Sequence, residues 1–177
     1  MNIATEPSEE LLAIPPEGRF WVVLHSRPRC EKKAVDFCER NGIESYLPLQ
    51  RKAHRYGGRV RTFSSPLFPG YVFCVTDMEQ KRLLRQNRNV ANLLEVWDQQ
   101  QLVSQLLQIR RALSVGDVVE VMPYLESGKI VRVKAGPFKG LEGIVVRIKS
   151  KAKVVINVDM IRQAVAVEVD SSFLAPA

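Results

Sequence analysis

Cysteine is the first residue type to consider for chemistry, because the chain contains three of them. Cys30 and Cys38 have seven residues between them, which is not a spacing of zinc ligands, and the two histidines do not cluster with them. Cys38 shares a helical face with Ala34 and Phe37, an arrangement typical of a buried thiol. With Cys74 alone further along the chain, the cysteines predict free thiols and no metal site.

The two histidines are the candidates for general acid–base catalysis. Neither His25 nor His54 forms a recognisable pair with a nucleophile or a carboxylate, and Asp36, Glu39 and Glu44 have the pattern of surface charges. The sequence therefore predicts a protein that is not an enzyme and needs no cofactor. Its function has to be sought in binding, and so in its basic and aromatic residues.

Charge is distributed unevenly along the 177 residues, whose formal net charge is +7. Residues 1–18 carry four acidic residues and no basic one, whereas residues 27–61 carry ten Lys or Arg against four acids and residues 128–177 carry nine against four. Basic domains attract phosphate-bearing or acidic partners, although a merely solvated surface gives the same composition. The chain has no run of about 18 apolar residues and no signal-peptide pattern, so we expect a cytoplasmic protein.

The first part of the chain alternates between predicted strands and predicted helices. Aromatic and β-branched residues predict strands over 19–26, 43–50, 68–75 and 90–96, and apolar residues at helical spacing predict helices from Pro28 to Gly42, over 79–87 and over 100–113. This order is typical of an α+β sandwich, in which helices pack on an antiparallel sheet. Between the second and third strands, Gly57-Gly58 predicts a hairpin turn between two strongly basic arms.

The last part of the chain is dominated by β-branched residues. Fifteen of the forty residues over 130–169 are Val or Ile, which favours strands over helices. Val131 and Val133 alternate with basic residues, and Gly136-Pro137 turns the chain toward a second strand. These patterns predict four or five antiparallel strands closed into a small β-barrel.

Four segments follow from these patterns. Residues 1–18, rich in Glu and Pro, predict a disordered acidic leader, with a short docking peptide around Leu11 and Leu12 as the alternative. Residues 19–113 form the α+β domain, residues 114–127 a linker and residues 128–177 the β-barrel.

The order of these features resembles the NusG family of transcription elongation factors. The resemblance rests on the aromatic strand 20–26, the basic helix start 27–33, the segment Phe68-Pro69-Gly70-Tyr71 and the barrel segment 131–145, which resembles the KOW motif. It covers residues 19–175 and implies a domain that binds RNA polymerase, followed by a small SH3-like KOW barrel. Transcription elongation or antitermination is the function that it implies.

The resemblance places the polymerase contact on the strand that follows the basic hairpin. Phe68, Pro69, Tyr71 and Phe73 would form a hydrophobic anchor for the clamp helices of RNA polymerase. Aromatic residues beside a glycine kink are typical of an exposed recognition patch. Packing in the core is the alternative, above all for Phe73.

Nine basic residues are the candidates for nucleic-acid contacts. Four of them lie at a helix start, where a positive charge is unfavourable to the helix dipole and each costs about 0.3 kcal/mol. This small cost hints that the four residues bind a partner. Family members run along upstream DNA and the non-template strand, so the resemblance favours DNA, although base reading cannot be inferred. The nine are Arg27, Arg29, Lys32, Lys33, Arg51, Lys52, Arg55, Arg59 and Arg61.

The KOW loop is the candidate site for a further partner. It comprises Gly136, Pro137, Phe138, Lys139 and Gly140, and we expect Phe138 to be exposed in it. In the family, the loops of this barrel contact termination factor Rho or a small-subunit ribosomal protein. An aromatic side chain that fills the turn is the alternative.

Two departures favour a specialised member of the family over the general factor. Residues 87–94 lack the Thr-Pro-Gly-Val-like segment of housekeeping members, and the basic hairpin is similar to that of RfaH and the regulators of polysaccharide operons. RfaH folds its C-terminal domain as a helical hairpin before activation, whereas the Val and Ile content here predicts a β-barrel. The rival from a different class is a KOW-containing, RNA-binding ribosomal or ribosome-assembly protein. In either case we expect a monomer that has no membrane partner.

Overall fold

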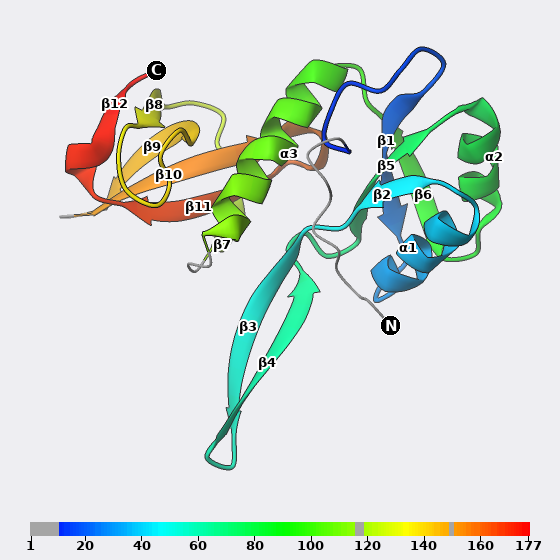
Figure 1. Ribbon diagram of the computed structural model, residues 1–177, viewed down its shortest axis with the longest axis horizontal. Coiled ribbons are helices and arrows are strands. Elements are labelled where there is room, and N and C mark those ends of the chain that lie inside the picture. Colours follow the sequence, from blue (N-terminus) through cyan, green and yellow to red (C-terminus); the bar gives the residue numbers. More distant parts are fainter. Residues whose placement is uncertain (1–10, 116–118, 149–150) are drawn as a thin grey trace. The chain divides into compact units, whose positions relative to one another are not determined.

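The computed structural model describes residues 11–115, 119–148 and 151–177, and within them the side chains of all but 53–56, 147, 148 and 151. The chain divides into two compact units, Met1–Gln100 and Gln101–Ala177. Helices and antiparallel strands make up the first unit, and the second is rich in antiparallel strands (Figure 1). The predicted α+β fold with a C-terminal β-domain is confirmed.

The N-terminal unit is built on a four-stranded antiparallel sheet with the strand order β2-β5-β1-β6. The two central strands pair from Phe20 opposite Thr76 to His25 opposite Tyr71. Two helices accompany the sheet, α1 beside β2 and β5 and α2 beside β5 and β6. The elements are β1 (Phe20–Ser26), α1 (Glu31–Arg40), β2 (Glu44–Tyr46), β5 (Tyr71–Thr76), α2 (Met78–Gln86) and β6 (Val90–Glu95).

Both faces of the two central strands are buried. One face belongs to a hydrophobic cluster with the helices, made of Val22, Leu24, Val72 and Cys74 from the strands, Ala34 and Cys38 from α1 and Leu84 from α2. The alternate residues of these strands, Trp21, Val23, Phe73 and Val75, point to the opposite face and are buried as well. This double burial explains why both strands are nearly continuous apolar runs.

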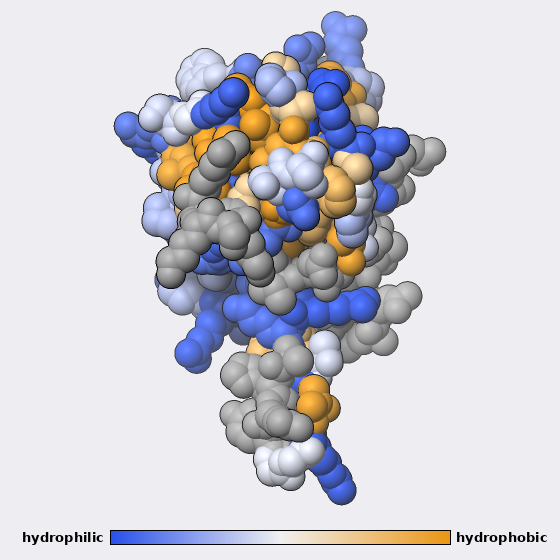
Figure 2. Space-filling model, turned by 90° about the vertical axis from the view of Figure 1, so that its left-hand side faces the viewer, coloured by the Kyte–Doolittle hydropathy of each residue, from blue (hydrophilic) through white to orange (hydrophobic). Residues whose placement is uncertain are grey.

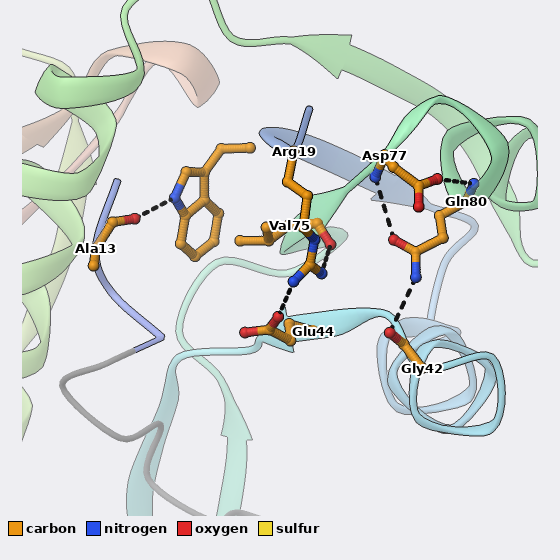
Figure 3. A network of polar contacts seen from close by, with 8 residues as sticks. Ala13, Arg19, Gly42, Glu44, Val75, Asp77 and Gln80 are labelled. Carbon is orange, nitrogen blue, oxygen red and sulfur yellow. Dashed lines mark hydrogen bonds and ion pairs between the residues drawn. The ribbon is translucent and has the colours of Figure 1, made fainter. Parts of the chain in front are cut away.

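The end of the predicted leader packs against this unit. Leu12 is 2% exposed, and the indole Nε1 of Trp21 donates a hydrogen bond of 3.0 Å to the carbonyl oxygen of Ala13 (Figure 3). Residues 11–18 therefore differ from the expectation of a segment without a core, because Leu12 is buried and the backbone of Ala13 is bonded to Trp21. Residues 1–10 of the predicted leader lie outside the described residues.

Polar contacts tie the loops of the unit to its sheet (Figure 3). The guanidinium group of Arg19 pairs with Glu44 and donates to the carbonyl oxygen of Val75 at 3.3 Å. Asp77 caps α2 by accepting from the backbone N of Gln80 at 2.8 Å, and the Gln80 side chain accepts in return from the backbone N of Asp77. This reciprocal pair satisfies backbone donors that the start of a helix leaves unpaired.

The predicted basic hairpin is present as a two-stranded sheet of its own. It consists of β3 (Leu49–Tyr56) and β4 (Arg59–Pro66), paired from Leu49 opposite Pro66 to Tyr56 opposite Arg59. Gly57 and Gly58 both have positive φ, +52° and +80°, as a tight type I′ hairpin turn requires. In Figure 1 the hairpin forms a narrow arm that leads away from the four-stranded sheet.

The C-terminal unit contains a six-stranded antiparallel sheet with the order β12-β8-β9-β10-β11-β7. Its strands are β7 (Glu120–Pro123), β8 (Lys129–Val133), β9 (Glu142–Ile148), β10 (Lys151–Val158), β11 (Gln163–Val169) and β12 (Leu174–Pro176). The KOW segment is thus built of strands and not of a helical hairpin. Strand β7 lies in the range 114–127 that was predicted as a linker; the sequence analysis missed it because the strand has only four residues.

The third helix, α3 (Gln99–Ser114), continues from the first unit into the second. Gln99 accepts a hydrogen bond of 2.7 Å from the backbone N of Trp21. Further along, Gln105 donates to Asp159 at 2.7 Å, and Arg111 donates to the carbonyl oxygen of Gly140 at 3.1 Å. The division of the chain into two compact units falls near the start of this helix, between Gln100 and Gln101.

Gly143 marks a close approach between neighbouring strands of the C-terminal sheet. A Cβ at this position would lie 2.4 Å from the carbonyl oxygen of Val155 and 2.9 Å from a methyl carbon of Val154. Backbone atoms cannot rotate away as a side chain can. We therefore expect Gly143→Ala to force β9 and β10 apart and to lower the free energy of unfolding by about 1–3 kcal/mol.

Urea denaturation of wild type and Gly143→Ala measures this loss, with Lys129→Ala, an exposed position on β8, as the control. An unchanged unfolding midpoint for Gly143→Ala would contradict the close approach.

Candidate functional site

The candidate site is centred on the turn formed by residues 67–70, which we call the Gly70 turn. Leu67 is buried and its backbone N donates to the carbonyl oxygen of Pro48 at 2.8 Å. Gly70 has a φ of +87°, and a Cβ there would touch the ring of His25 at 3.4 Å. Glycine is therefore suited to this position for both its backbone conformation and its small size. The turn leaves Pro69 exposed at its tip.

Two members of the predicted hydrophobic anchor are buried. Phe68 and Phe73 have no exposed surface, and their rings meet edge to face with centroids 6.4 Å apart. Phe73 lies in a strand whose two faces are both covered, and Phe68 packs against it. The expectation of an exposed Phe68 is thus corrected, and Pro69 and the half-buried Tyr71 are the members that reach the surface.

His25 joins the exposed part of the site. It lies directly opposite Tyr71 in the pairing of β1 with β5, and the two rings stack with centroids 4.9 Å apart at an angle of 17°. The sequence analysis considered His25 only as a possible base. The stacking of His25 on Tyr71 depends on the register of β1 with β5, and nothing in the local sequence indicates that register.

Glu31 fixes the Gly70 turn from the side of α1. Its side chain oxygen Oε1 accepts a hydrogen bond of 2.7 Å from the backbone N of Gly70, and the residue is only 8% exposed. The carbonyl oxygen of Gly70 accepts in turn from the backbone N of Ser26 at 2.8 Å. Both polar groups of this glycine are therefore held, one by a helix and one by a strand. Glu31 is also the acidic residue in the first turn of α1, where it favours the helix dipole, but nothing in the local sequence indicates its contact with Gly70.

Four of the predicted basic residues lie close in sequence to Ser26 and Glu31, the two residues that bond to Gly70. Arg27, Arg29, Lys32 and Lys33 are all exposed, and none forms an ion pair with another residue in the described ranges. They are near the Gly70 turn because Ser26 and Glu31 both bond to Gly70: Arg27 and Arg29 lie between these two residues in sequence, and Lys32 and Lys33 directly follow Glu31.

Arg29 has an unusual backbone. Its φ is +61°, inside a tight turn closed by a 3.0 Å hydrogen bond from the backbone N of Cys30 to the carbonyl oxygen of Arg27. The left-handed conformation costs an L-residue with a side chain about 1–2 kcal/mol, and glycine is the usual choice there. An exposed arginine at such a position is a reason to look for a binding role.

Three of the five predicted hairpin cations share one face of the arm. Residues opposite one another in an antiparallel pair share a face, so Lys52, which is opposite Phe63, lies on the same face as Arg59 and Arg61. Lys52, Arg59 and Arg61 are exposed, and Phe63 is 44% exposed. Arg51 is exposed on the other face, while the side chain of Arg55 lies outside the described residues. Hydrophilic and hydrophobic side chains both appear along this arm in Figure 2.

The KOW loop is ordered by its own backbone. Gly140 donates to the carbonyl oxygen of Val133 at 2.8 Å, and Lys139 donates to that of Gly136 at 3.2 Å. Phe138 is only 7% exposed, so the expectation of an exposed aromatic side chain is corrected: the ring fills the turn, as in the alternative considered above. Gly136, Pro137 and Lys139 are the exposed residues of the loop.

In the ranges that the structure describes, no three His, Cys, Asp or Glu side chains come together as a metal site would require. None of the described helices is long and apolar enough to cross a membrane.

A sheet-and-helix domain with a basic hairpin, joined to a KOW-type β-domain, is the architecture of a transcription elongation factor. Two protein-family models match the chain and support this class of protein. The NusG family, described as transcription termination factor nusG, matches residues 19–111, and the KOW motif matches residues 127–157.

The first match covers more than half of the chain, and the chain therefore belongs to the NusG family. Members of this family are transcription elongation and antitermination factors; they bind RNA polymerase and are not enzymes. A search of curated proteins finds no match.

Glu31→Ala tests how the Gly70 turn is held. The substitution leaves the buried backbone N–H of Gly70 without an acceptor, and we expect a loss of about 1–3 kcal/mol in the free energy of unfolding. Glu31→Gln keeps an oxygen in place and should lose less. Urea denaturation measures the stability, and amide hydrogen exchange at Gly70 reports the bond itself. Equal exchange rates in wild type and Glu31→Ala would contradict this role.

Proposed function

We propose that this chain is an operon-specific antitermination factor that binds RNA polymerase through its N-terminal unit and suppresses pausing or termination. The C-terminal β-domain then recruits a second factor. The proposal is carried by one observation: a chain of the NusG family presents a firmly held turn with a proline and an adjoining aromatic ring, and exposed cations at its side. We also propose that the chain is cytoplasmic, acts as a monomer, needs no cofactor and catalyses no reaction.

The polymerase contact is assigned to the exposed side chains of the Gly70 turn. Pro69 and Tyr71 offer apolar surface, and the ring of His25 extends it through the stack with Tyr71. Because Glu31 and Ser26 already hold Gly70, little conformational freedom is lost on binding. Such a preorganised aromatic patch suits a hydrophobic anchor on the clamp helices. Phe68 and Phe73 support it from the core.

Upstream or non-template DNA is the partner proposed for the basic residues. The hairpin face with Lys52, Arg59 and Arg61 combines positive charge with the partly exposed ring of Phe63. Cations that track phosphates, together with an aromatic ring on which a base can stack, are the usual elements of single-strand binding. Arg27, Arg29, Lys32 and Lys33 would contact phosphates closer to the polymerase.

The partner of the C-terminal β-domain is proposed to be Rho or a small-subunit ribosomal protein. In the KOW loop, Gly136, Pro137 and Lys139 are available for it, and Gly140 is half-buried. Phe138 acts indirectly, since its ring holds the loop in shape.

The operon-specific subtype is supported by the hairpin. It has eight residues in each strand and carries exposed cations in both strands. A long charged arm of this kind adds a contact that a general factor does not need.

Retention of RNA polymerase core by the purified chain tests the proposed anchor. We expect wild type to retain polymerase and a Pro69→Ala/Tyr71→Ala variant to lose at least about tenfold in affinity, which corresponds to roughly 1.4 kcal/mol. The matched control is Met78→Ala/Leu83→Ala, which removes exposed apolar side chains from α2 of the same unit. Circular dichroism establishes that each variant is folded.

Two results would count against this assignment. Equal loss in both double variants would mean that the Gly70 turn is not the anchor. No retention by wild type at low salt would favour the rival function, an RNA-binding ribosomal or assembly protein, and binding of the chain to ribosomal RNA would then be measured.

A charge variant of the hairpin tests the DNA contact. With Arg59→Gln/Arg61→Gln, binding to single-stranded DNA should weaken, and the slope of log K against log salt should fall by up to about 1.4, because each phosphate contact on a single strand contributes roughly 0.7. Titration at several salt concentrations measures the slope. The control is Arg82→Gln, an exposed arginine on α2. An unchanged slope in the hairpin variant would place the DNA elsewhere.

A further inference from the structure

Two buried thiols meet in the core of the N-terminal unit. The sulfur atoms of Cys38 on α1 and Cys74 on β5 lie 3.9 Å apart, and neither residue has any exposed surface. Both belong to the hydrophobic cluster between the helices and the sheet. They are separated by 35 residues in sequence and are brought together only by the packing of α1 on the sheet.

Apart from each other, the two thiols have few polar neighbours among the described residues. The neighbours of Cys74 across the sheet are Val22 on β1 and Ser45 on β2. The pKa of Cys38 is lowered, mainly by the hydrogen bond with Cys74 and to a smaller extent by one with the Ser45 side chain. Burial raises this pKa, but its effect is outweighed. The hydrogen bond to Cys38 and burial raise the pKa of Cys74 well above its usual value. Of the two thiols, Cys38 is therefore the one that loses its proton more readily.

We propose that Cys38 and Cys74 are an oxidisable dithiol, which hydrogen peroxide converts to an intramolecular disulfide. The Cys38 thiolate attacks one peroxide oxygen; the O–O bond breaks, Cys38 becomes a sulfenic acid and hydroxide leaves with the electron pair. The Cys74 sulfur then attacks the Cys38 sulfur and expels the sulfenic oxygen, which takes up the Cys74 proton and leaves as water. The first hydroxide combines with the proton that Cys38 had released. In sum, two thiols and one peroxide give one disulfide and two waters.

The geometry favours closure of the bridge over further oxidation of Cys38. A disulfide has a sulfur–sulfur distance of about 2.05 Å, so the two sulfurs must approach by roughly 2 Å in total. Each sulfur turns on a single side-chain bond, and α1 is a peripheral helix of ten residues whose Asp36, Glu39 and Arg40 face solvent. Because the resolving thiol already touches Cys38, a sulfenic acid there has a partner at once.

The bridge would join the two elements that build the candidate site. Helix α1 begins at Glu31, which holds Gly70, and strand β5 begins at Tyr71. Oxidation would therefore add a covalent tie between the helix and the strand behind the Gly70 turn. This consequence concerns structure and stability, so it can be tested without reference to polymerase binding.

The experiment uses the full chain with Cys30→Ser, which removes the third thiol, a half-buried one, and leaves only the pair. The folded protein is treated with hydrogen peroxide, quenched with catalase, unfolded and alkylated with iodoacetamide. We expect intact mass spectrometry to show a loss of two hydrogen atoms and no alkylation, and digestion without reductant to yield a linked peptide that contains both cysteines. Dithiothreitol should restore both alkylation sites. The oxidised chain should also unfold at a higher urea concentration than the reduced one, since a cross-link constrains the unfolded state.

Several outcomes would overturn the proposal. Alkylation of both cysteines after prolonged peroxide treatment would show that the pair does not react. A gain of two or three oxygen atoms on Cys38 with Cys74 still free would show that the thiols do not close. A disulfide-linked dimer would show that the bridge forms between chains. A second variant, Cys30→Ser/Cys74→Ala, serves as a check, because it should trap sulfenic acid on Cys38 with dimedone and form no intramolecular link.

Discussion

The antiparallel pairing of β1 with β5 is the constraint on which the N-terminal unit depends. These strands lie in the middle of the sheet and are covered on both faces, so their side chains supply much of the apolar burial that stabilises the unit. The same register that sets Trp21 opposite Val75 in the core sets His25 opposite Tyr71 at the end of the pair. The surface patch of the candidate site is thus a direct continuation of the core, and it inherits the rigidity of the two central strands.

Strand register also explains which parts of the site could be predicted from sequence. Local patterns predicted the helices, the hairpin and most strands: apolar alternation the strands, helical spacing the helices and Gly57-Gly58 the hairpin turn, whereas the four-residue β7 was missed. The exposure of Phe68 and Phe138 was predicted incorrectly, since a glycine-rich setting suggests a surface loop but does not show what covers each ring. The contact between Glu31 and Gly70 spans 39 residues in sequence, and no local pattern reveals it.

Charge in this unit is divided between a buried part and an exposed part. Glu31 places a carboxylate under the Gly70 turn, where it holds a backbone N–H, while the cations that precede and follow it in sequence point to solvent. Glu31 offsets part of the electrostatic cost of placing Arg27, Arg29, Lys32 and Lys33 at a helix start, because an acidic residue in the first turn favours the helix dipole. The surface itself stays cationic. The surface near the Gly70 turn therefore combines positive charge with apolar side chains.

Of all the elements, the hairpin contributes least obviously to the stability of the fold. A two-stranded sheet with both edges open has little independent stability, and this one exposes Val60 and Phe63. Open edges with apolar side chains would invite pairing with other chains, and the lysine and arginine residues along both strands oppose such pairing. That protective role explains the amount of charge but not the placement of Lys52, Arg59 and Arg61 on one face with Phe63. Arg51 lies on the other face, so charge protects both faces of the arm, while the face of Lys52, Arg59 and Arg61 adds to its charge a partly exposed aromatic ring.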